Sequence, residues 1–531
     1  MKRIHALVLS CLLLAGCAGH AMPEPPKEPH GHPPGSPPGL AMQQTRPVTV
    51  PVITPATLPQ KPFSDRDYDA SYAADAVRIT LSGDTASCED ASVQIDRSTV
   101  TVTQKGTYIL SGQLDGMVIV DAEQKDKVQL VLENAAIHSE TCAAIYIAQA
   151  DKVFLTLPEG TSNALSNGGS FLPMDGSNID AALFSKDDLT VNGAGTLHIQ
   201  SPAGHGIVSK DELTITGGVI SVEAAAHGIT GQDCVSIDGA ALAITCGKDA
   251  IQAEHDEDPE KGFVYLGSGT LECSAGDNGI RATGILQIDG AALQLTCVSD
   301  ALHTQRDLMI NGGDITVSTQ DDGFHADGIL AVSGGNIAVT ESYEGFEGES
   351  VWISGGNISL ICADDGINAA GGNDQSGFGG PGGDRFHTGD GSCILISGGS
   401  LYVNAAGDGV DSNGDLCITG GQITVEGPTD GGNGPLDYSG SGGITGGSLI
   451  ATGAAQMAQS LHPQGQGVLF ATFAPQSALT SVIITDEAGN TLLTAAPAKE
   501  FASLVLSSPE IQSGQTYRVT AGNFTAEIQA Q

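Results

Sequence analysis

The sequence is poor in aromatic and basic residues. Aromatic side chains make up 4% of the 531 residues and include one Trp, Trp352, so the chain cannot build a large aromatic core. Lys and Arg number 21 against 62 Asp and Glu, which gives a formal net charge of −41 at pH 7. A nucleic acid would meet repulsion instead of releasing counterions, and this excludes nucleic acid as a partner.

Paired cysteines and long apolar segments are also missing. No CxxC sequence occurs, which argues against structural zinc and redox chemistry. Nine cysteines follow Cys17, an odd number without paired spacing, so we expect small buried residues at positions such as Cys246, Cys297 and Cys362 instead of a disulfide framework. Beyond residue 17, no stretch is apolar enough to span a membrane.

The start of the chain resembles a bacterial lipoprotein signal. Lys2 and Arg3 precede a short apolar run, and the run ends in Leu14-Ala15-Gly16-Cys17, which has the form of a lipobox. We expect a signal peptide at residues 1–16, cleaved before Cys17, with lipid on the thiol and amine of that cysteine. An ordinary signal peptide is the alternative. The mature protein is then expected outside the cytoplasm, anchored to the bacterial membrane or cell surface only by its lipid.

Glycine-rich turns repeat along most of the remaining chain. The residue at the corner of each turn is Gly or Ala, and the spacings between successive corners are 22, 22, 29, 22, 22, 22, 21 and 43 residues. A unit of about 22 residues repeated this often predicts one element stacked on itself. The corner positions are Gly206, Gly228, Ala250, Gly279, Ala301, Gly323, Gly345, Gly366 and Gly409.

Within each unit, apolar residues alternate with small or polar ones. Leu213-Thr-Ile215 and Ile220-Ser-Val222 are examples, and no helical period appears. The unit is too short for a strand with a crossover helix, so parallel strands must be wound as a solenoid. We therefore predict an all-β fold, a right-handed parallel β-helix, with a small C-terminal antiparallel β module. The expected domains are a signal peptide (1–16), a proline-rich linker (17–62), the β-helix (63–465) and the C-terminal module (466–531).

Acidic residues precede the corner glycine in four successive units. We call Asp322, Glu344, Asp365 and Asp408 the acidic ladder. Equivalent positions of a solenoid stack at about 4.8 Å, and two carboxylates at that distance repel by roughly 3 to 4 kcal/mol at an effective dielectric constant near 20. Two positions past the corner, the ladder residues have the partners His325, Glu347, Asn368 and Asp411.

Calcium would remove this repulsion, because it takes roughly six to eight oxygen ligands and could bridge neighbouring coils. The alternative is that Asp and Asn occur there only as good turn formers. For Asp249, Asp277 and Asp300, which lack an acidic partner, we favour that alternative. The predicted calcium ligands are Glu344, Glu347, Asp364, Asp365, Asn368, Asp408, Asp411 and Asn413.

The chain resembles a family of extracellular bacterial carbohydrate-binding proteins whose calcium-binding parallel β-helix is similar to that of pectate lyases. The resemblance runs through most of residues 76–453 and also fits "SSPEIQSGQTYRV" at 507–519. The stretches that carry it include "GTYILSG" at 106–112, "KVQLVLENAAI" at 127–137, "SKDDLTVNGAGTL" at 185–197, "HGIVSKDELTITGG" at 205–218, "YEGFEGE" at 343–349, "ADDGINAAGG" at 363–372 and "GDGVDSNGDLCITGG" at 407–421.

This resemblance implies a surface lipoprotein that binds acidic polysaccharide such as polygalacturonate or pectin, with calcium ligands within the set given above. Because the chain is strongly acidic, binding of a polyuronate is expected to require calcium. Trp352 lies between the inward-facing Val351 and Ile353, so it is expected to face outward, where it could stack on a sugar. An exposed Trp without a ligand is the alternative.

An enzyme is the rival interpretation, because pectin lyases and polygalacturonases share this fold. A lyase would need a basic residue near a calcium-bound uronate, and a hydrolase would need two carboxylates. We favour a non-catalytic binder, and a structural or adhesive surface protein is a third alternative. The candidates for catalysis are Arg281, Arg306 and Arg385 for a lyase, and Asp321-Asp322, Asp364-Asp365 and Gly204-His205-Gly206 for a hydrolase.

Overall fold

The protein is described by a computed structural model that covers residues 48–58, 62–174, 176, 178–369 and 391–531. Cys17 and Arg385 lie outside these residues, so their predicted roles stay predictions.

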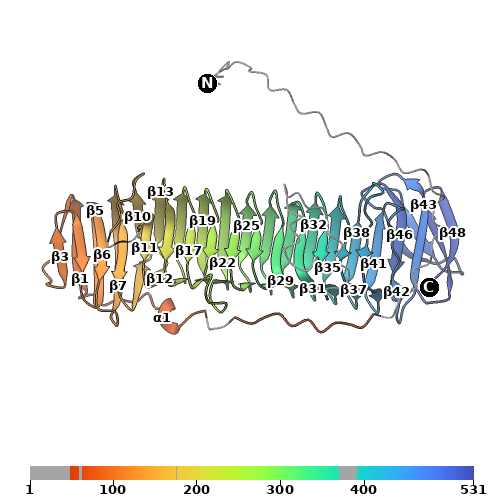
Figure 1. Cartoon of the computed structure of the whole chain (residues 1–531), viewed down its shortest axis with the longest axis horizontal. Helices are drawn as coiled ribbons and strands as arrows, with labels where there is room; N and C mark the ends of the chain where they lie inside the picture. Colours follow the sequence, from red (N-terminus) through yellow and green to blue (C-terminus); the bar gives the residue numbers. More distant parts are fainter. Residues whose placement is uncertain (1–47, 59–61, 175, 177, 370–390) are drawn as a thin grey trace, which may run out of the picture. The chain divides into compact units, whose positions relative to one another are not determined.

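Each repeat unit forms one coil of three short strands. In one such coil, β12 (Asp188–Gly193), β13 (Thr196–Ser201) and β14 (His205–Ser209) follow one another along the chain. Each pairs in parallel with its equivalent in the next coil, which is β15 (Glu212–Ile215), β16 (Val219–Ala224) or β17 (Ile229–Gly231). Figure 1 shows the coils stacked side by side. The predicted parallel β-helix is confirmed.

The parallel pairings arrange the strands in three columns, which we number in the order in which a coil passes through them. Column I continues β12 and β15 with β1 (Val77–Gly83), β5 (Gly106–Asp115), β7 (Lys127–Ser139), β9 (Lys152–Leu157), β18 (Cys234–Ile237), β21 (Phe263–Leu266), β24 (Leu286–Ile288), β27 (Leu308–Ile310), β29 (Phe324–Val332), β31 (Phe346–Ile353), β34 (Cys393–Ile396), β37 (Asp415–Ile418), β40 (Gly442–Ile444) and β42 (His462–Pro463).

The other two columns are built in the same way, and the long strands β5, β7, β29 and β31 each contribute to two columns. Column II contains, besides β13 and β16, β10 (Ser162–Asn167), β19 (Ala240–Cys246), β22 (Gly269–Ala275), β25 (Ala292–Thr296), β28 (Asp314–Ser318), β30 (Asn336–Glu341), β32 (Asn357–Cys362), β35 (Ser400–Ala405), β38 (Gln422–Glu426) and β41 (Ser448–Gly453). Column III contains, besides β14 and β17, β4 (Thr99–Val102), β6 (Met117–Asp121), β8 (Ile145–Gln149), β11 (Ala181–Ser185), β20 (Ile251–Ala253), β23 (Ile280–Ala282), β26 (Leu302–Thr304), β33 (Ile367–Ala369), β36 (Asp411–Ser412) and β39 (Asp437–Tyr438).

Both ends of the stack pair with antiparallel strands. At the first end, β2 (Thr85–Ser87) pairs with β1, and β3 (Val93–Asp96) pairs with β4. At the other end, β46 (Phe501–Ser507) pairs with β41 and with β43 (Val468–Gln476). These pairings cover sheet edges that would otherwise expose unpaired backbone groups. A separate antiparallel sheet of four strands confirms the predicted C-terminal β module: β45 (Thr491–Ala495), β44 (Val482–Thr485), β47 (Thr516–Ala521) and β48 (Phe524–Gln529).

The core is aliphatic and runs through the inside of the coils. Alternate residues of each strand face inward, as the period of two in the sequence predicts; Leu242 and Ile244 of β19 are buried while Ala243 between them is exposed. Cys246, Cys297 and Cys362 belong to this core, and the nine cysteines among the described residues form no disulfide. Their predicted role as small buried residues is confirmed.

The corner glycines allow successive coils to approach closely just before column III. A Cβ atom at Gly366 would lie 2.5 Å from the carbonyl oxygen of Gly409 and 2.2 Å from Cγ1 of Val403. A side chain at this corner would therefore push the next coil away. The close approach fixes the position of Asp365, the ladder residue directly before the corner.

An N-terminal segment, residues 48–58, packs against the outer face of column I. Val48 is buried with Leu395 and Cys417, and the backbone N–H of Ala56 donates to Oδ2 of Asp307 at 2.6 Å. Farther along the chain, the short helix α1 (Asp65–Tyr68) is held by Asp67, whose buried carboxylate lies 3.0 Å from Lys152 Nζ. This part of the chain therefore lies along the coils (Figure 1).

Candidate functional site

The acidic ladder lies on successive coils, directly before the strands of column III. The side chains of Asp322, Glu344, Asp365 and Asp408 are all less than a tenth exposed. The strand pairing also places Glu347 opposite Asn368, and Asn368 opposite Asp411. The stacking predicted from the repeat is therefore present, and the carboxylates are buried, unlike those of exposed turns.

One carboxylate oxygen of several ladder residues joins its coil to the next. Oδ1 of Asp322 accepts a hydrogen bond from the backbone N–H of Glu344 at 3.2 Å. Oδ1 of Asp365 accepts from the N–H of Asp408 at 2.6 Å, and Oδ1 of Asp408 accepts from the N–H of Gly434 at 2.5 Å. The fold itself thus favours a short acceptor side chain at this position, apart from any ligand.

Three carboxylates meet at one place on the ladder. Asp365, Asp408 and Asp411 each offer an oxygen atom, and these atoms lie within 4.8 Å of one another. Burial, together with the negative charges of Asp408, Asp411 and Asp364, raises the pKa of Asp365 well above its ordinary value. Asp364 is half-buried beside this trio. A divalent cation is the ligand that such a group of oxygens suits.

Two buried oxygen atoms on neighbouring coils have no hydrogen-bond partner among the described residues. The first is Oδ1 of Asn368, whose Nδ2 donates to Oε2 of Glu344 at 3.1 Å. The second is Oε1 of Glu347, whose other oxygen contacts Nδ1 of His325. Burial raises the pKa of Glu347 to about 8, although the hydrogen bond to His325 opposes this shift. An unpartnered buried oxygen costs about 1 to 3 kcal/mol, and a bound cation would remove that cost.

The remaining predicted ligand, Asn413, follows β36. It is half-buried, and its backbone N–H donates to the carbonyl oxygen of Ala369 at 3.0 Å. Its predicted role as a ligand stays a prediction.

Trp352 faces away from the core, as the alternation in β31 predicts, but its indole is not fully exposed. It is half-buried and packs beside two apolar clusters on the outer face of column I, one of which contains Val48 of the N-terminal segment. Its Nε1 donates to Oγ of Ser397 at 3.2 Å. The stacking of a sugar on Trp352 stays a prediction, and this packing reduces the ring surface that a sugar could reach.

The candidate catalytic residues have structural contacts. Arg281 lies 3.8 Å from Oε1 of Glu254, and the guanidinium of Arg306 donates to the carbonyl oxygen of Pro259. The ring of His205 stacks on His227 with centroids 5.1 Å apart. These contacts agree with an interpretation of the repeat in which such residues support neighbouring coils.

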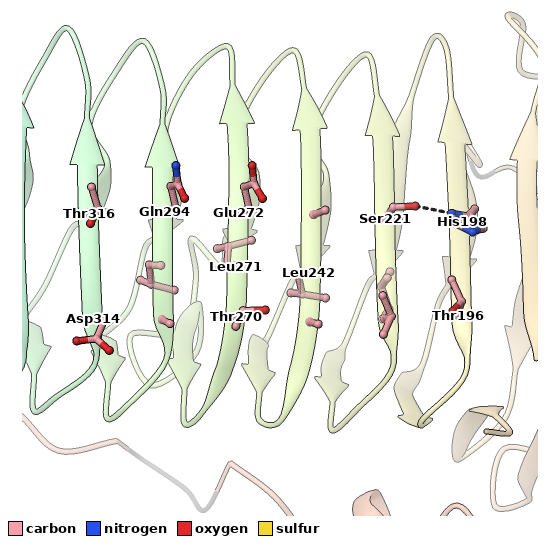
Figure 2. A pocket seen from close by; sticks show the side chains of 16 residues that line it. Thr196, His198, Ser221, Leu242, Thr270, Leu271, Glu272, Gln294, Asp314 and Thr316 are labelled. Carbon is pink, nitrogen blue, oxygen red and sulfur yellow. Dashed lines mark hydrogen bonds between the residues drawn. The ribbon is translucent and has the colours of Figure 1, made fainter. Parts of the chain in front are cut away.

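A shallow groove of about 510 Å³ crosses the outer face of column II, and sequence reasoning did not place it. Alanines at outward positions, Ala241, Ala243 and Ala292, leave the surface hollow across the middle strands. In Figure 2, polar side chains lie along the groove, including Glu272 on the middle strand β22 and, at one end, His198 on β13, whose Nδ1 lies 2.7 Å from Oγ of Ser221. Short outward residues in consecutive units are the sequence signal that could have found it.

In the described part of the chain, no helix is long and apolar enough to cross a bilayer.

Comparison with known proteins identifies the family. The sequence profile of the carbohydrate-binding domain-containing proteins matches residues 96–345, a range that includes Asp322 and Glu344 of the ladder. The solved structure of the polysaccharide lyase-like protein from C. thermocellum, a gadolinium derivative, matches with a TM-score of 0.42 and 28% identity, over 48% of this chain and 96% of that one. A carbohydrate-binding domain-containing protein from Acetivibrio thermocellus is 36% identical over 219 residues, which are 40% of this chain and 76% of the relative. The chain therefore belongs to the family of carbohydrate-binding domain-containing proteins.

Proposed function

We propose that the protein is a non-catalytic surface lipoprotein that binds acidic polysaccharide, such as polygalacturonate or pectin, through calcium held by the acidic ladder. The observation that carries this proposal is the buried trio of Asp365, Asp408 and Asp411, in register with Asn368, whose Oδ1 has no hydrogen-bond partner among the described residues. Calcium ligands in proteins are carboxylate and amide oxygens of this kind.

The residues present fit calcium by type. The trio of Asp365, Asp408 and Asp411 supplies carboxylates, and Asn368 supplies a carbonyl oxygen. Glu347 is in register with Asn368, but its carboxylate lies with Asp322 and His325 and not with the trio. In this role the calcium ion would neutralise the buried charge and present a positive site to an anionic sugar.

The charge of the protein supports a requirement for a cation. At a net charge of −41, the chain repels a polyuronate unless positive charge lies between them. Calcium on the ladder would supply that charge where the carboxylates are concentrated. Binding should therefore disappear when calcium is removed, and it should weaken as the ionic strength rises.

The groove on column II offers a second contact for carbohydrate. Its exposed polar side chains, among them Glu272 and Gln294, can hydrogen-bond to sugar hydroxyls, and its alanines leave room for a ring. We assign it to uncharged parts of the polysaccharide, because Glu272 and Asp314 would repel a uronate.

Two further points support a binder over an enzyme and a position at the cell surface. The arginines Arg281 and Arg306, candidates for a lyase base, contact Glu254 and Pro259. The lipobox ending in Cys17 supports export and lipid attachment.

The test is co-sedimentation of the full chain with polygalacturonate, in calcium and then in EDTA, while ultraviolet absorbance follows the release of unsaturated uronides. We expect retention only in calcium and a flat absorbance trace. Rising absorbance would show a lyase, and no retention in either buffer would show that the protein does not bind this polysaccharide. Asp365→Asn should lose retention, because an amide keeps the acceptor for the Asp408 N–H but lacks the charge. The control is Glu349→Gln, which removes the same charge from an exposed position on the strand that carries Glu347.

A further inference from the structure

Two histidines extend the acidic ladder on its N-terminal side. His303 and His325 are register neighbours in column III, and their rings stack with centroids 4.9 Å apart and planes 7° apart. Nδ1 of His303 lies 2.7 Å from Oδ2 of Asp300, and Nδ1 of His325 lies 3.4 Å from Oδ2 of Asp322. Each Nδ1 atom therefore faces the acidic residue three positions earlier in its own coil.

These residues form a compact group of nitrogen and oxygen donors. Asp300, His303 and His325 offer ligand atoms within 4.8 Å of one another, and so do Asp322, His325 and Glu347. Asp300, Asp322 and Glu347 are buried, and the side chains of His303 and His325 are 21% and 12% exposed. The group is thus shielded from solvent, with His325 common to both sets.

Glu347 gives an independent indication of a ligand. Its Oε2 contacts Nδ1 of His325, but its Oε1 has no hydrogen-bond partner within the described parts of the chain, although the residue is only 2% exposed. Buried carboxylate oxygens in a purely structural ion-pair network are normally all hydrogen-bonded. The unpartnered oxygen therefore points to a missing positive partner at this place.

We propose that Asp300, His303, Asp322 and His325, together with Glu347, form a binding site for a divalent transition-metal ion of the zinc type, separate from the calcium ligands of the trio. Imidazole nitrogen combined with carboxylate oxygen is the donor set that zinc and similar ions use, whereas calcium takes oxygen alone. The absence of CxxC excludes zinc held by cysteine pairs and has no bearing on this donor set.

Binding requires only small movements of the side chains. Two atoms bound to the same zinc ion at about 2.0 to 2.1 Å in a tetrahedral site lie roughly 3.3 Å apart. Within each of the two sets the donor atoms lie within 4.8 Å of one another, so an ion would draw His325 and the other donors of its set together. The backbones of His303, His325 and Glu347 are paired in register on β26, β29 and β31, so the sheet holds these three donors in place.

The test is a calorimetric titration of zinc chloride into the full, chelator-treated chain, in a background in which His20, His30 and His32, which precede the described residues, are replaced by Ala. We expect saturable binding that weakens at least tenfold in His303→Gln and in His325→Gln. The matched control is His205→Gln, which removes one ring from a similar stacked pair, His205 and His227, that lacks this set of carboxylates. It should leave zinc binding unchanged.

Two further measurements keep this inference separate from the proposed function and from misfolding. Asp408→Asn should weaken binding of calcium at least tenfold but leave zinc binding unchanged, because Asp408 belongs to the trio alone. Cobalt added to the same background without His20, His30 and His32 should give a visible spectrum typical of imidazole ligands. Absence of saturable zinc binding, equal binding in the His303 and His325 variants, or a cobalt spectrum of oxygen ligands only would overturn the proposal and leave a buried ion-pair network.

Discussion

The backbone N–H of Asp408 lies 2.6 Å from Oδ1 of Asp365, although 43 residues separate them in the chain. Most other corner-to-corner steps are 21 or 22 residues long, so the extra residues form an insertion that leaves the ladder continuous. The same step brings Asp411 into register with Asn368. The coil that carries Asp408 and Asp411 therefore stays in register with the coil that carries Asp365, despite the insertion between them.

We predict opposite effects of two substitutions at Asp365 in the absence of calcium. Asp365→Asn keeps an acceptor for the Asp408 N–H and removes a buried charge, so it should stabilise the metal-free protein by about 1 to 3 kcal/mol. Asp365→Ala also removes the acceptor, which costs about 1 to 3 kcal/mol and offsets this gain. In EDTA, the midpoint temperature of thermal unfolding should be higher for Asp365→Asn than for Asp365→Ala and for the unmodified chain. In calcium, the unmodified chain should have the highest midpoint temperature. The same order of the three proteins in both buffers would contradict the calcium assignment.

We predict that Asp67 makes the attachment of α1 dependent on pH. Burial alone would raise the pKa of Asp67, but hydrogen bonds from Ser64, Thr190 and Lys152 outweigh it and lower the pKa to about 2, from an ordinary value of 3.8. A carboxylate with a lowered pKa stabilises the folded state above its unfolded pKa. Its contribution, about 2 kcal/mol, should therefore be lost as the pH falls from about 4 to about 2.

The measurement for Asp67 is a comparison of unfolding with Asp67→Asn across this range. The variant should be less stable than the unmodified chain at pH 7, and the difference should vanish near pH 2. Asp65→Asn, an exposed residue in the same helix, serves as the control and should show no such convergence. A constant difference between the Asp67 variant and the unmodified chain at all pH values would contradict the prediction.

A third prediction concerns the groove on column II. Ala243→Arg fills the hollow from an exposed position of β19, so it should weaken binding of neutral oligosaccharides without changing stability. Affinity electrophoresis in a gel that contains the polysaccharide measures this effect. Gln422→Arg, at an exposed position of β38 outside the groove, is the matched control. Equal retardation of both variants and the unmodified chain would show that carbohydrate does not use the groove.

A fourth prediction concerns the lipid anchor. Cys17→Ala should move the exported protein from the membrane fraction to the soluble fraction, because the lipid is the only expected attachment. Fractionation of cells that express each form, with detection by immunoblot, measures this. A variant that stays in the membrane fraction would show another attachment.

The repeat allowed most of the fold to be predicted, because inward residues with a period of two leave few alternatives. The outward direction of Trp352 followed from Val351 and Ile353. The packing of Val48 near that face could not be predicted, since the proline-rich segment has no period that fixes its position on the coils.

The candidate site was predictable only in part. Stacking of the ladder followed from the 22-residue spacing, but the unpartnered oxygens of Glu347 and Asn368 depend on side-chain rotamers. The sequence gives no sign of a site at Asp300, because its partner is His303 instead of an acid, and the 2.7 Å contact between them appears only in three dimensions. The groove also escaped prediction, because its lining comes from small residues on several coils.

The most direct test of the ladder as a calcium site is calorimetric titration of calcium into the unmodified chain, Asp408→Asn and Glu349→Gln, each with and without polygalacturonate. We predict saturable calcium binding in the unmodified chain and in Glu349→Gln that becomes tighter when polygalacturonate is present. In Asp408→Asn, we predict that the affinity for calcium falls at least tenfold. Equal calcium affinity in all three proteins, or no saturable binding in any of them, would contradict the assignment of the acidic ladder as the site that holds calcium and polysaccharide together.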